Sequence, residues 1–196
     1  MPKTGMEPIR RKALIGATIA EIGALGSLDV TVGKIAKRAG VSSALAHHYF
    51  GGKDDLLLAA MRHLLGQLGL SASKELKQAH GPEQRLQAII NASFAPSQFS
   101  KPTVSAWLSF YVQAQSSTRA ARLLRVYTRR LHSNLLFDLK KLTNPENADE
   151  IAKGVAGMID GFYIRHALRG HALQRDEMLG IINRYWQLSI ATPAKP

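Results

Sequence analysis

The 196-residue sequence has no cysteine, and this absence excludes disulfides, thiol nucleophiles and cysteine-ligated zinc. A long apolar run is also missing, because the longest stretch without a formal charge, residues 102–118, is interrupted by Ser, Gln and Thr. We therefore expect no membrane-spanning helix and no membrane partner. The N-terminal segment lacks the apolar core of a signal peptide, so we expect the protein in the cytoplasm.

Acidic residues are scarce relative to basic ones. The chain has 26 Lys and Arg against 14 Asp and Glu, a formal net charge of +12. Residues 1–53 hold eight basic and three acidic side chains, so this quarter is about twice as positive per residue as the rest. Nucleic acid is the first partner to consider, an acidic membrane surface the second, and a merely basic surface the third alternative.

Two local groups of basic residues allow more than one interpretation. Residues 10–12 fit a solvated face as well as a non-specific attraction to phosphate. The arginines at 119, 122, 125 and 129 form a stripe along one predicted helix, most simply a solvated face. Aromatic residues are nearly absent from the first 89 positions, which hold only Tyr49 and Phe50. The C-terminal part is therefore better suited to an apolar or π-binding partner.

Apolar residues recur at helical spacing almost throughout, and no alternating strand pattern extends beyond a few residues. Breaks in this pattern occur at Gly26, Gly40, Gly51-Gly52, Gly81-Pro82 and Asn144-Pro145. Thr31 and Ser42 are good N-caps for two short helices. The sequence predicts an all-α fold of about nine helices, in which a helix from Lys53 to about Gln78 leads out of the N-terminal region.

The segment TVGKIAKRAGVSSALAHHYFGGKDDLL, which begins at Thr31, predicts a helix-turn-helix over about residues 31–50. Gly40 permits a tight turn between the two helices. The side chains placed to hold the helices at a fixed angle are Ile35, Ala36, Val41, Ala46 and Phe50. Such a unit projects the N-terminal side chains of its second helix into the major groove of DNA.

The candidate DNA contacts are of two kinds. Ser and His can hydrogen-bond base edges, and Ala and Leu can touch thymine methyl groups; the residues in question are Ser43, Ala44, Leu45, His47 and His48. We expect Leu45 to be exposed, and one histidine to face the groove while the other can pack against a neighbouring helix. The residues expected at phosphates are Thr31, Ser42, Tyr49 and Lys53. Plain N-capping and a solvated lysine are the alternatives for Thr31, Ser42 and Lys53.

This segment resembles the DNA-binding domain of the TetR family of bacterial repressors, from Arg10 to Leu57. The resemblance rests on Thr31, Ile35-Ala36, residues 39–42, His48-Tyr49-Phe50 and Lys53. It implies a DNA-binding domain at 8–68, a ligand-binding and dimerisation domain at 69–191, and a homodimer on double-stranded operator DNA. Gly33, Ala44 and His47 depart from residues common in the family, which leaves the operator sequence undetermined.

The opening MPKTGMEPIRRKALI, the block HHYFGGKDDLL and the segment MIDGFYIRHAL resemble the choline-responsive repressors of this family. The resemblance implies control of glycine betaine synthesis genes, a role in osmoprotection and choline as the effector. Aromatic faces supplemented by a carboxylate hold such a quaternary ammonium. The candidate ligand-binding residues are Trp107, Phe110, Tyr111, Tyr127, Asp160, Phe162 and Tyr163. Any single aromatic among them can instead belong to the core.

Three glycines follow one another at helical spacing in a predicted C-terminal helix. Gly154, Gly157 and Gly161 each cost roughly 1 kcal/mol of helix propensity relative to Ala, but together they make a smooth stripe for close packing. We expect this stripe and Trp186 to form the homodimer interface. The alternative is packing against another helix of the same subunit.

Other functional classes remain as alternatives. An enzyme has little support, since Gly-x-Ser-x-Gly, His-Glu-x-x-His and phosphate-cradling Gly-rich loop motifs are all missing. We expect neither a cofactor nor a metal. A multidrug regulator of the same family, sensing lipophilic cations and controlling an efflux pump, would use the same aromatics. A non-specific nucleoid or membrane-surface protein would bind according to total charge alone.

Overall fold

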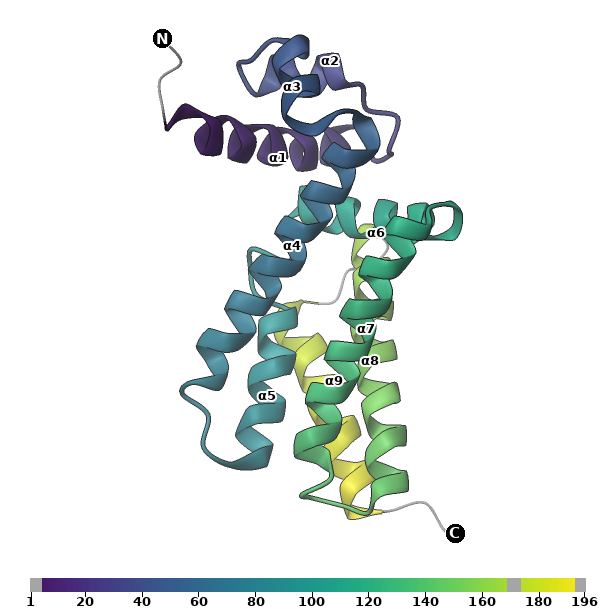
Figure 1. Cartoon of the computed structure of the whole chain (residues 1–196). Helices are drawn as coiled ribbons and strands as arrows, with labels where there is room; N and C mark the ends of the chain where they lie inside the picture. The colour runs from purple at the N-terminus through teal and green to yellow at the C-terminus, as the bar shows by residue number, and fades with distance from the viewer. Residues whose placement is uncertain (1–4, 169–173, 193–196) are drawn as a thin grey trace. The chain divides into compact units, whose positions relative to one another are not determined.

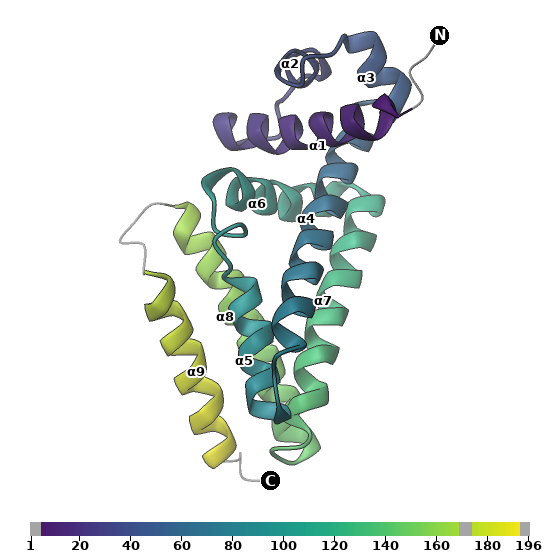
Figure 2. The same ribbon diagram turned by 90° about the vertical axis from the view of Figure 1, so that its left-hand side faces the viewer.

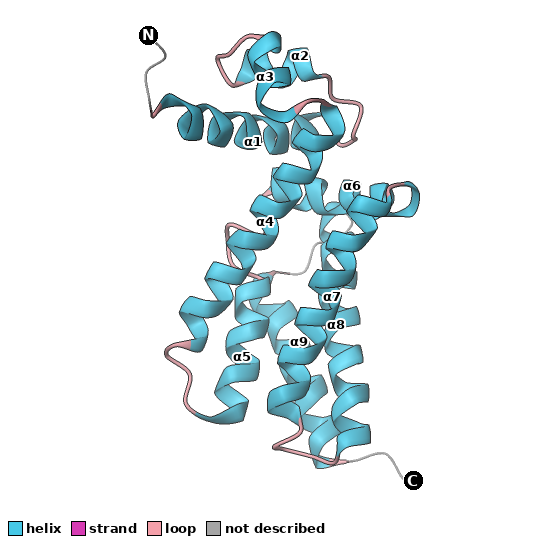
Figure 3. Ribbon diagram, in the orientation of Figure 1, coloured by secondary structure: helices cyan, strands magenta, loops and turns pink. Residues whose placement is uncertain are grey.

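The computed structural model describes residues 5–168 and 174–192. Over these ranges it contains nine helices, joined by turns and loops, and no strand (Figure 1, Figure 3). The predicted all-α fold is confirmed over these ranges. The helices are α1 (Met6–Leu25), α2 (Val32–Arg38), α3 (Ser43–Phe50), α4 (Lys53–Leu76), α5 (Gly81–Ser93), α6 (Lys101–Ser116), α7 (Thr118–Leu139), α8 (Pro145–Ala167) and α9 (Arg175–Ala191).

Local sequence signals set several helix ends. Gly26 ends α1 in the left-handed conformation, with a φ of 68°, and its N–H donates to the Ile22 carbonyl at 2.8 Å. The Asn144 side chain caps α8 by accepting from the Asn147 N–H at 2.9 Å, and Pro145 occupies the first turn. Helix α4 ends at Leu76, two residues before the predicted end. Residues next to each helix end therefore determine where these helices begin and end.

The chain divides into two compact units, and each is built from two separate segments. The first unit holds residues 1–66 and 100–123, and the second holds residues 67–99 and 124–196. The sequence predicts one boundary between residues 68 and 69, whereas the structure also places α6 and the start of α7 in the first unit. The reason is close packing of α6 on α1, which Figure 2 shows.

Apolar side chains fill the interior of each unit. In the first unit the fully buried large side chains include Leu14, Ile35, Leu56, Leu58 and Phe110. In the second they include Leu86, Phe94, Ile90, Leu135, Leu139, Ile151 and Ile159. Burial of these side chains is the main favourable term that holds the helices together. Within the described ranges, no helix combines the length and apolarity needed to span a bilayer.

Candidate nucleic-acid interface and effector site

Helices α2 and α3 both begin at a hydroxyl cap. The Thr31 hydroxyl oxygen accepts a hydrogen bond from the Lys34 N–H at 3.2 Å, and the Ser42 hydroxyl oxygen accepts one from the Leu45 N–H at 3.2 Å. Both capping side chains are exposed. A hydroxyl that accepts from the backbone retains its own O–H as a donor. Capping and a phosphate contact are therefore compatible at both positions.

A tight turn centred on Gly40 joins α2 to α3. Gly40 has a φ of 68°, in the left-handed region that favours glycine. Across the turn, the Val41 N–H donates to the Ala36 carbonyl at 3.0 Å. Ile35, Ala36 and Ala46 are buried, so the small side chains lie where the two helices approach. The predicted helix-turn-helix is present, with the turn chemistry that the sequence indicates.

The exposed face of α3 carries most of the predicted base-reading residues. Ser43, Ala44, His47 and His48 are exposed, and their contact with bases stays a prediction. Leu45 is half-buried, so the expectation of an exposed leucine is wrong and only part of this side chain is accessible. Neither histidine packs in the core, because the interior position of α3 is taken by Ala46.

The ring of His47 is fixed by its own helix end. Its Nδ1 lies 2.9 Å from the Gly51 carbonyl oxygen, which can only accept. Nδ1 must therefore carry a proton and donate. In the neutral ring, the other nitrogen, Nε2, is then a hydrogen-bond acceptor. An exposed acceptor on a recognition helix matches the amino groups of adenine and cytosine in the major groove.

Arg11 of α1 is one of the basic residues 10–12, for which the sequence leaves a solvated face and an attraction to phosphate as alternatives. Its guanidinium lies 5.5 Å from the centre of the Tyr49 ring and 5.0 Å from that of Phe50, at cation–π distance. Its Nε also donates to the Glu7 carboxylate at 2.8 Å. Arg11 thus links α1 to the end of α3, where Tyr49 is half-buried. The i, i+4 spacing of Glu7 and Arg11 was the sequence signal for part of this arrangement.

Three of the predicted ligand-binding residues lie on α6 in the first unit. Trp107 and Phe110 are buried, with 3% and 1% of their surface exposed, and their ring centres are 6.3 Å apart. Tyr111 is half-buried, 6.2 Å from the ring of Trp107. Trp107 and Tyr111 are one turn apart, so they lie on one side of the helix. Whether any of the three contacts an effector stays a prediction.

The other four predicted ligand-binding residues lie in the second unit. Tyr127 of α7 and Tyr163 of α8 lie near Asp160, also on α8. Burial raises the pKa of the Tyr127 phenol above its ordinary value, and the Asp160 carboxylate adds to this effect. Burial likewise raises the pKa of the Tyr163 phenol, with contributions from Tyr127 and Asp160. The structure therefore brings two phenols and one carboxylate together. Phe162 is half-buried and contacts the ring of Phe94.

Aromatic residues that the sequence did not single out surround Tyr163. Its ring centre lies 5.1 Å from that of Phe99 and 6.1 Å from that of Phe94, and its hydroxyl donates to the Ser93 carbonyl. The His166 ring lies 4.5 Å from Phe99. Phe94 is the C-cap residue of α5, and Phe99 lies in the segment between α5 and α6. Helical periodicity therefore gave no signal for them.

The structure corrects part of the predicted dimer interface. A Cβ at Gly154 would lie 2.0 Å from the Tyr185 hydroxyl of the same chain, so Gly154 serves packing between α8 and α9. Trp186 is 4% exposed and donates from Nε1 to the Asn183 side chain, which makes it a core residue of the single chain. A Cβ at Gly157 or Gly161 would meet no other atom of the described residues within 4 Å, and the interface role of these two glycines stays a prediction.

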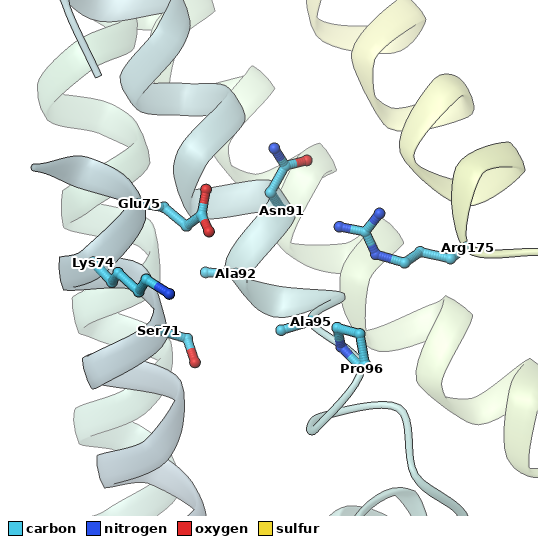
Figure 4. A pocket seen from close by; sticks show the side chains of 8 residues that line it. All are labelled: Ser71, Lys74, Glu75, Asn91, Ala92, Ala95, Pro96 and Arg175. Atoms are coloured by element: carbon cyan, nitrogen blue, oxygen red, sulfur yellow. The ribbon is translucent and has the colours of Figure 1, made fainter. Parts of the chain in front are cut away.

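A polar hollow of about 250 Å³ lies in the second unit between α4, α5 and the start of α9. Figure 4 shows Lys74 and Glu75 projecting from α4, and Arg175 reaching across toward Asn91. Arg175 Nε also donates to the Phe94 carbonyl at 2.8 Å. The hollow has charges of both signs but no aromatic lining residue. It therefore lacks the aromatic faces that a quaternary ammonium needs.

Comparisons with known proteins agree over most of the chain. The family "Bacterial regulatory proteins, tetR family" matches residues 14–60, and the family "BetI-type transcriptional repressor, C-terminal" matches residues 82–190. The HTH-type transcriptional regulator BetI of Brucella suis is 53% identical over 191 residues, which cover 97% of this chain and 96% of that protein. The protein of the same name from Agrobacterium fabrum is 50% identical, and the match covers 97% of this chain and 92% of that protein.

Solved structures with low sequence identity show the same fold. A transcriptional regulator from Pseudomonas aeruginosa PAO1 has a TM-score of 0.81 at 24% identity, covering 94% of this chain and 92% of that one. A transcriptional regulator from Saccharomonospora viridis, solved in complex with choline, has a TM-score of 0.79 at 20% identity, covering 90% and 95%. The relatives are transcriptional regulators and not enzymes. The chain belongs to the TetR family of bacterial transcriptional regulators and carries a BetI-type repressor C-terminal domain.

Proposed function

We propose that this repressor controls genes of the choline-to-glycine-betaine pathway and that choline releases it from its operator. The observation that carries the choline assignment is the electrostatic interaction of the Asp160 carboxylate with the buried phenols of Tyr127 and Tyr163. A quaternary ammonium offers no hydrogen-bond donor at nitrogen, so aromatic faces and a nearby carboxylate are the groups that hold it. The choline complex of the Saccharomonospora viridis regulator, which has the same fold, supports this assignment.

The DNA-binding role uses the exposed face of α3 and the caps of the helix-turn-helix. Ser43, Ala44, His47 and His48 would read base edges, joined by the accessible part of Leu45. The phosphate contacts would be Thr31, Ser42, Tyr49 and Lys53. Positive charge in residues 1–53 supplies attraction that falls with salt concentration. The protein acts on chromosomal DNA and therefore in the cytoplasm.

Regulators of this family act as dimers on operator DNA and respond to small molecules. A two-fold dimer would place two α3 helices in major grooves about 34–36 Å apart, or a multiple of that distance, so the operator should be roughly palindromic. Gly157 and Gly161 would contribute to the interface between the two copies. A typical allosteric coupling of about 1–3 kcal/mol corresponds to a 5- to 150-fold loss of DNA affinity when choline binds.

The experiment measures operator affinity by fluorescence anisotropy, with DNA from the region upstream of the choline and betaine-aldehyde dehydrogenase genes. Choline should weaken binding to this DNA at least five-fold. Asp160→Asn should abolish the choline response and retain DNA binding. Glu75→Gln is the matched control, since it removes a carboxylate of the polar hollow that has no aromatic lining. An unchanged affinity at saturating choline would contradict the proposal.

A multidrug regulator of the same family is the second candidate, because aromatic rings and Asp160 also suit lipophilic cations. The two functions differ in selectivity. A choline sensor should respond to choline and fail to respond to bulky cationic dyes. Release from DNA by several unrelated dyes, with a weak response to choline, would favour the second candidate.

A further inference from the structure

A second hollow, of about 270 Å³, lies in the first compact unit, where α4 faces the start of α7. Its lining residues are Arg62, Thr118, Arg119, Arg122 and Leu123. Three of these five carry a positive charge and none carries a negative one. We propose that this arginine hollow binds a small anion with phosphate chemistry, such as an oligophosphate or a phosphorylated metabolite.

Two of the three guanidinium groups are available to an anion. Arg119 donates from Nη2 to the Asp55 carboxylate at 2.7 Å. Arg62 and Arg122, in contrast, form no ion pair with any residue that the structure describes. A guanidinium presents planar, paired N–H donors that match the oxygens of a phosphate group. Convergence of Arg62 and Arg122 on one hollow therefore suits an anion with several oxygens.

The start of α7 adds neutral donors to the same hollow. Thr118 is the first residue of this 22-residue helix, and its side chain is exposed. The Ser117 hydroxyl oxygen accepts from the Ala120 N–H at 3.3 Å, which caps one N–H of the first turn. The N–H groups of Thr118 and Arg119 precede any intrahelical bond, and the helix dipole places its positive end there. Helix polarity and arginine charge thus act in the same direction.

The arginine hollow is distinct from the proposed phosphate contacts of the helix-turn-helix. Arg62 follows Lys53 by nine positions on the continuous helix α4. At 1.5 Å and 100° per residue, this separation is roughly 13 Å along the axis and about half a turn around it. Arg62 therefore projects from the side of α4 opposite to Lys53. A DNA backbone bound at Lys53 would lie on the other side of this helix.

Anion binding would affect the link between α7 and the α3–α4 turn. One oxygen of Asp55 accepts from Arg119, and the other lies 3.4 Å from the position of a Cβ on Gly51. An anion bound by Arg119 would compete with Asp55 for the guanidinium. Because Asp55 lies two residues after Lys53, this competition would alter operator affinity. This consequence, unlike the binding itself, rests on the proposed DNA-binding function.

Calorimetric titration of the full-length protein with inorganic pyrophosphate, without DNA and at constant ionic strength, tests the binding. We expect one saturable site per chain. The double variant Arg62→Gln/Arg122→Gln should weaken pyrophosphate binding at least ten-fold. Arg129→Gln is the matched control, since Arg129 is an exposed arginine of α7 outside the hollow, and it should bind as the wild type.

Three results would overturn the proposal. The first is the absence of saturable pyrophosphate binding by the wild-type protein. The second is an equal loss of binding in Arg129→Gln, which would indicate attraction to net charge alone. The third is loss of binding in Lys53→Gln with full binding in the double variant, which would place the anion at the helix-turn-helix. Since neither choline nor DNA is present, failure here is separable from failure of the proposed repressor function.

Anisotropy measurements with operator DNA then test the consequence. Pyrophosphate should change operator affinity of the wild type at least three-fold and have no such effect on the double variant. An equal effect on both proteins would show competition at the DNA surface instead. A loss of operator affinity in the double variant without pyrophosphate would show that the arginines contact the DNA backbone, and this would also contradict the proposal.

Discussion

Gly23 of α1 lies so close to Pro102 of α6 that a Cβ at position 23 would stand 2.4 Å from the Pro102 Cα and 2.6 Å from its Cβ. Real side chains do not approach a backbone to this distance, so one of the two helices would have to move. Gly23 is therefore the residue that lets α6 pack on α1. This approach explains why α6 belongs to the first compact unit although it lies far along the chain.

We predict that Gly23→Ala destabilises the protein by about 1–3 kcal/mol, because overpacking against Pro102 outweighs the gain in helix propensity. The matched control is Gly16→Ala in the same helix, where a Cβ meets no atom within 4 Å. That variant should be more stable by up to about 1 kcal/mol. Urea denaturation of both variants measures whether the free energy of unfolding falls or rises relative to the wild type. A stabilised Gly23→Ala would contradict the packing described.

His47 should select bases with an exposed amino group. Its Nδ1 donates to Gly51, so the neutral ring presents an acceptor to the groove. We expect His47→Ala to lower the preference for adenine or cytosine at one symmetric pair of operator positions by about 1 kcal/mol, roughly five-fold. Binding to operators changed one base pair at a time checks this, with His48→Ala for comparison. If the wild type instead prefers guanine at these positions and His47→Ala loses that preference, the assignment of Nε2 as the acceptor is wrong.

Tyr127 and Tyr163 should ionise at unusually high pH. Burial and Asp160 raise the pKa values of Tyr127 and Tyr163 in the folded protein. Above the ordinary tyrosine pKa of about 10, the unfolded chain loses these protons before the folded one, so the free energy of unfolding falls as pH rises. Spectrophotometric titration should show tyrosine ionisation well above the ordinary pKa, and Asp160→Asn should move this ionisation to lower pH. Absence of this late ionisation would contradict the burial of the two phenols.

Gly157 and Gly161 should tolerate no large side chain if they lie between two copies of the chain. A Cβ at either position would meet open space in the single chain, so Gly157→Arg should leave the protomer folded. We expect this variant to sediment as a monomer and to lose at least ten-fold in operator affinity. Gly66→Arg on α4, where a Cβ also meets open space, is the control and should remain a dimer. A dimeric Gly157→Arg would exclude this interface.

Local chemistry made much of the fold predictable from the sequence. Gly26, Thr31, Ser42 and Asn144 end or begin helices through hydrogen bonds made within four residues, and the structure shows each of these ends. The helix-turn-helix was predictable for the same reason, since Gly40 and the small residues beside it act over a short segment. Such signals depend only on neighbouring residues and not on distant parts of the chain.

The candidate sites were less predictable, because their residues meet across helices. The sequence predicts Leu45 and Trp186 as surface contacts, yet neighbouring helices bury them partly or fully. Gly154 fits a dimer stripe by spacing, but Tyr185 fills the space beside it. Phe94 and Phe99 are not part of a helical pattern of apolar residues, although they pack around Tyr163. Burial and partner identity depend on contacts between distant segments, which periodicity does not encode.

The sequence by itself determined the helical fold, the recognition motif and the family, because these depend on short-range hydrogen bonds and on ordered residue patterns. Only the tertiary structure decided which side chains share a site. It placed Arg11 against Tyr49, grouped Tyr127 and Tyr163 with Asp160, and made Arg62 face the start of α7. The stripe that begins at Arg119 is typical of a solvated face, but Arg119 and Arg122 line a hollow together with Arg62 of α4.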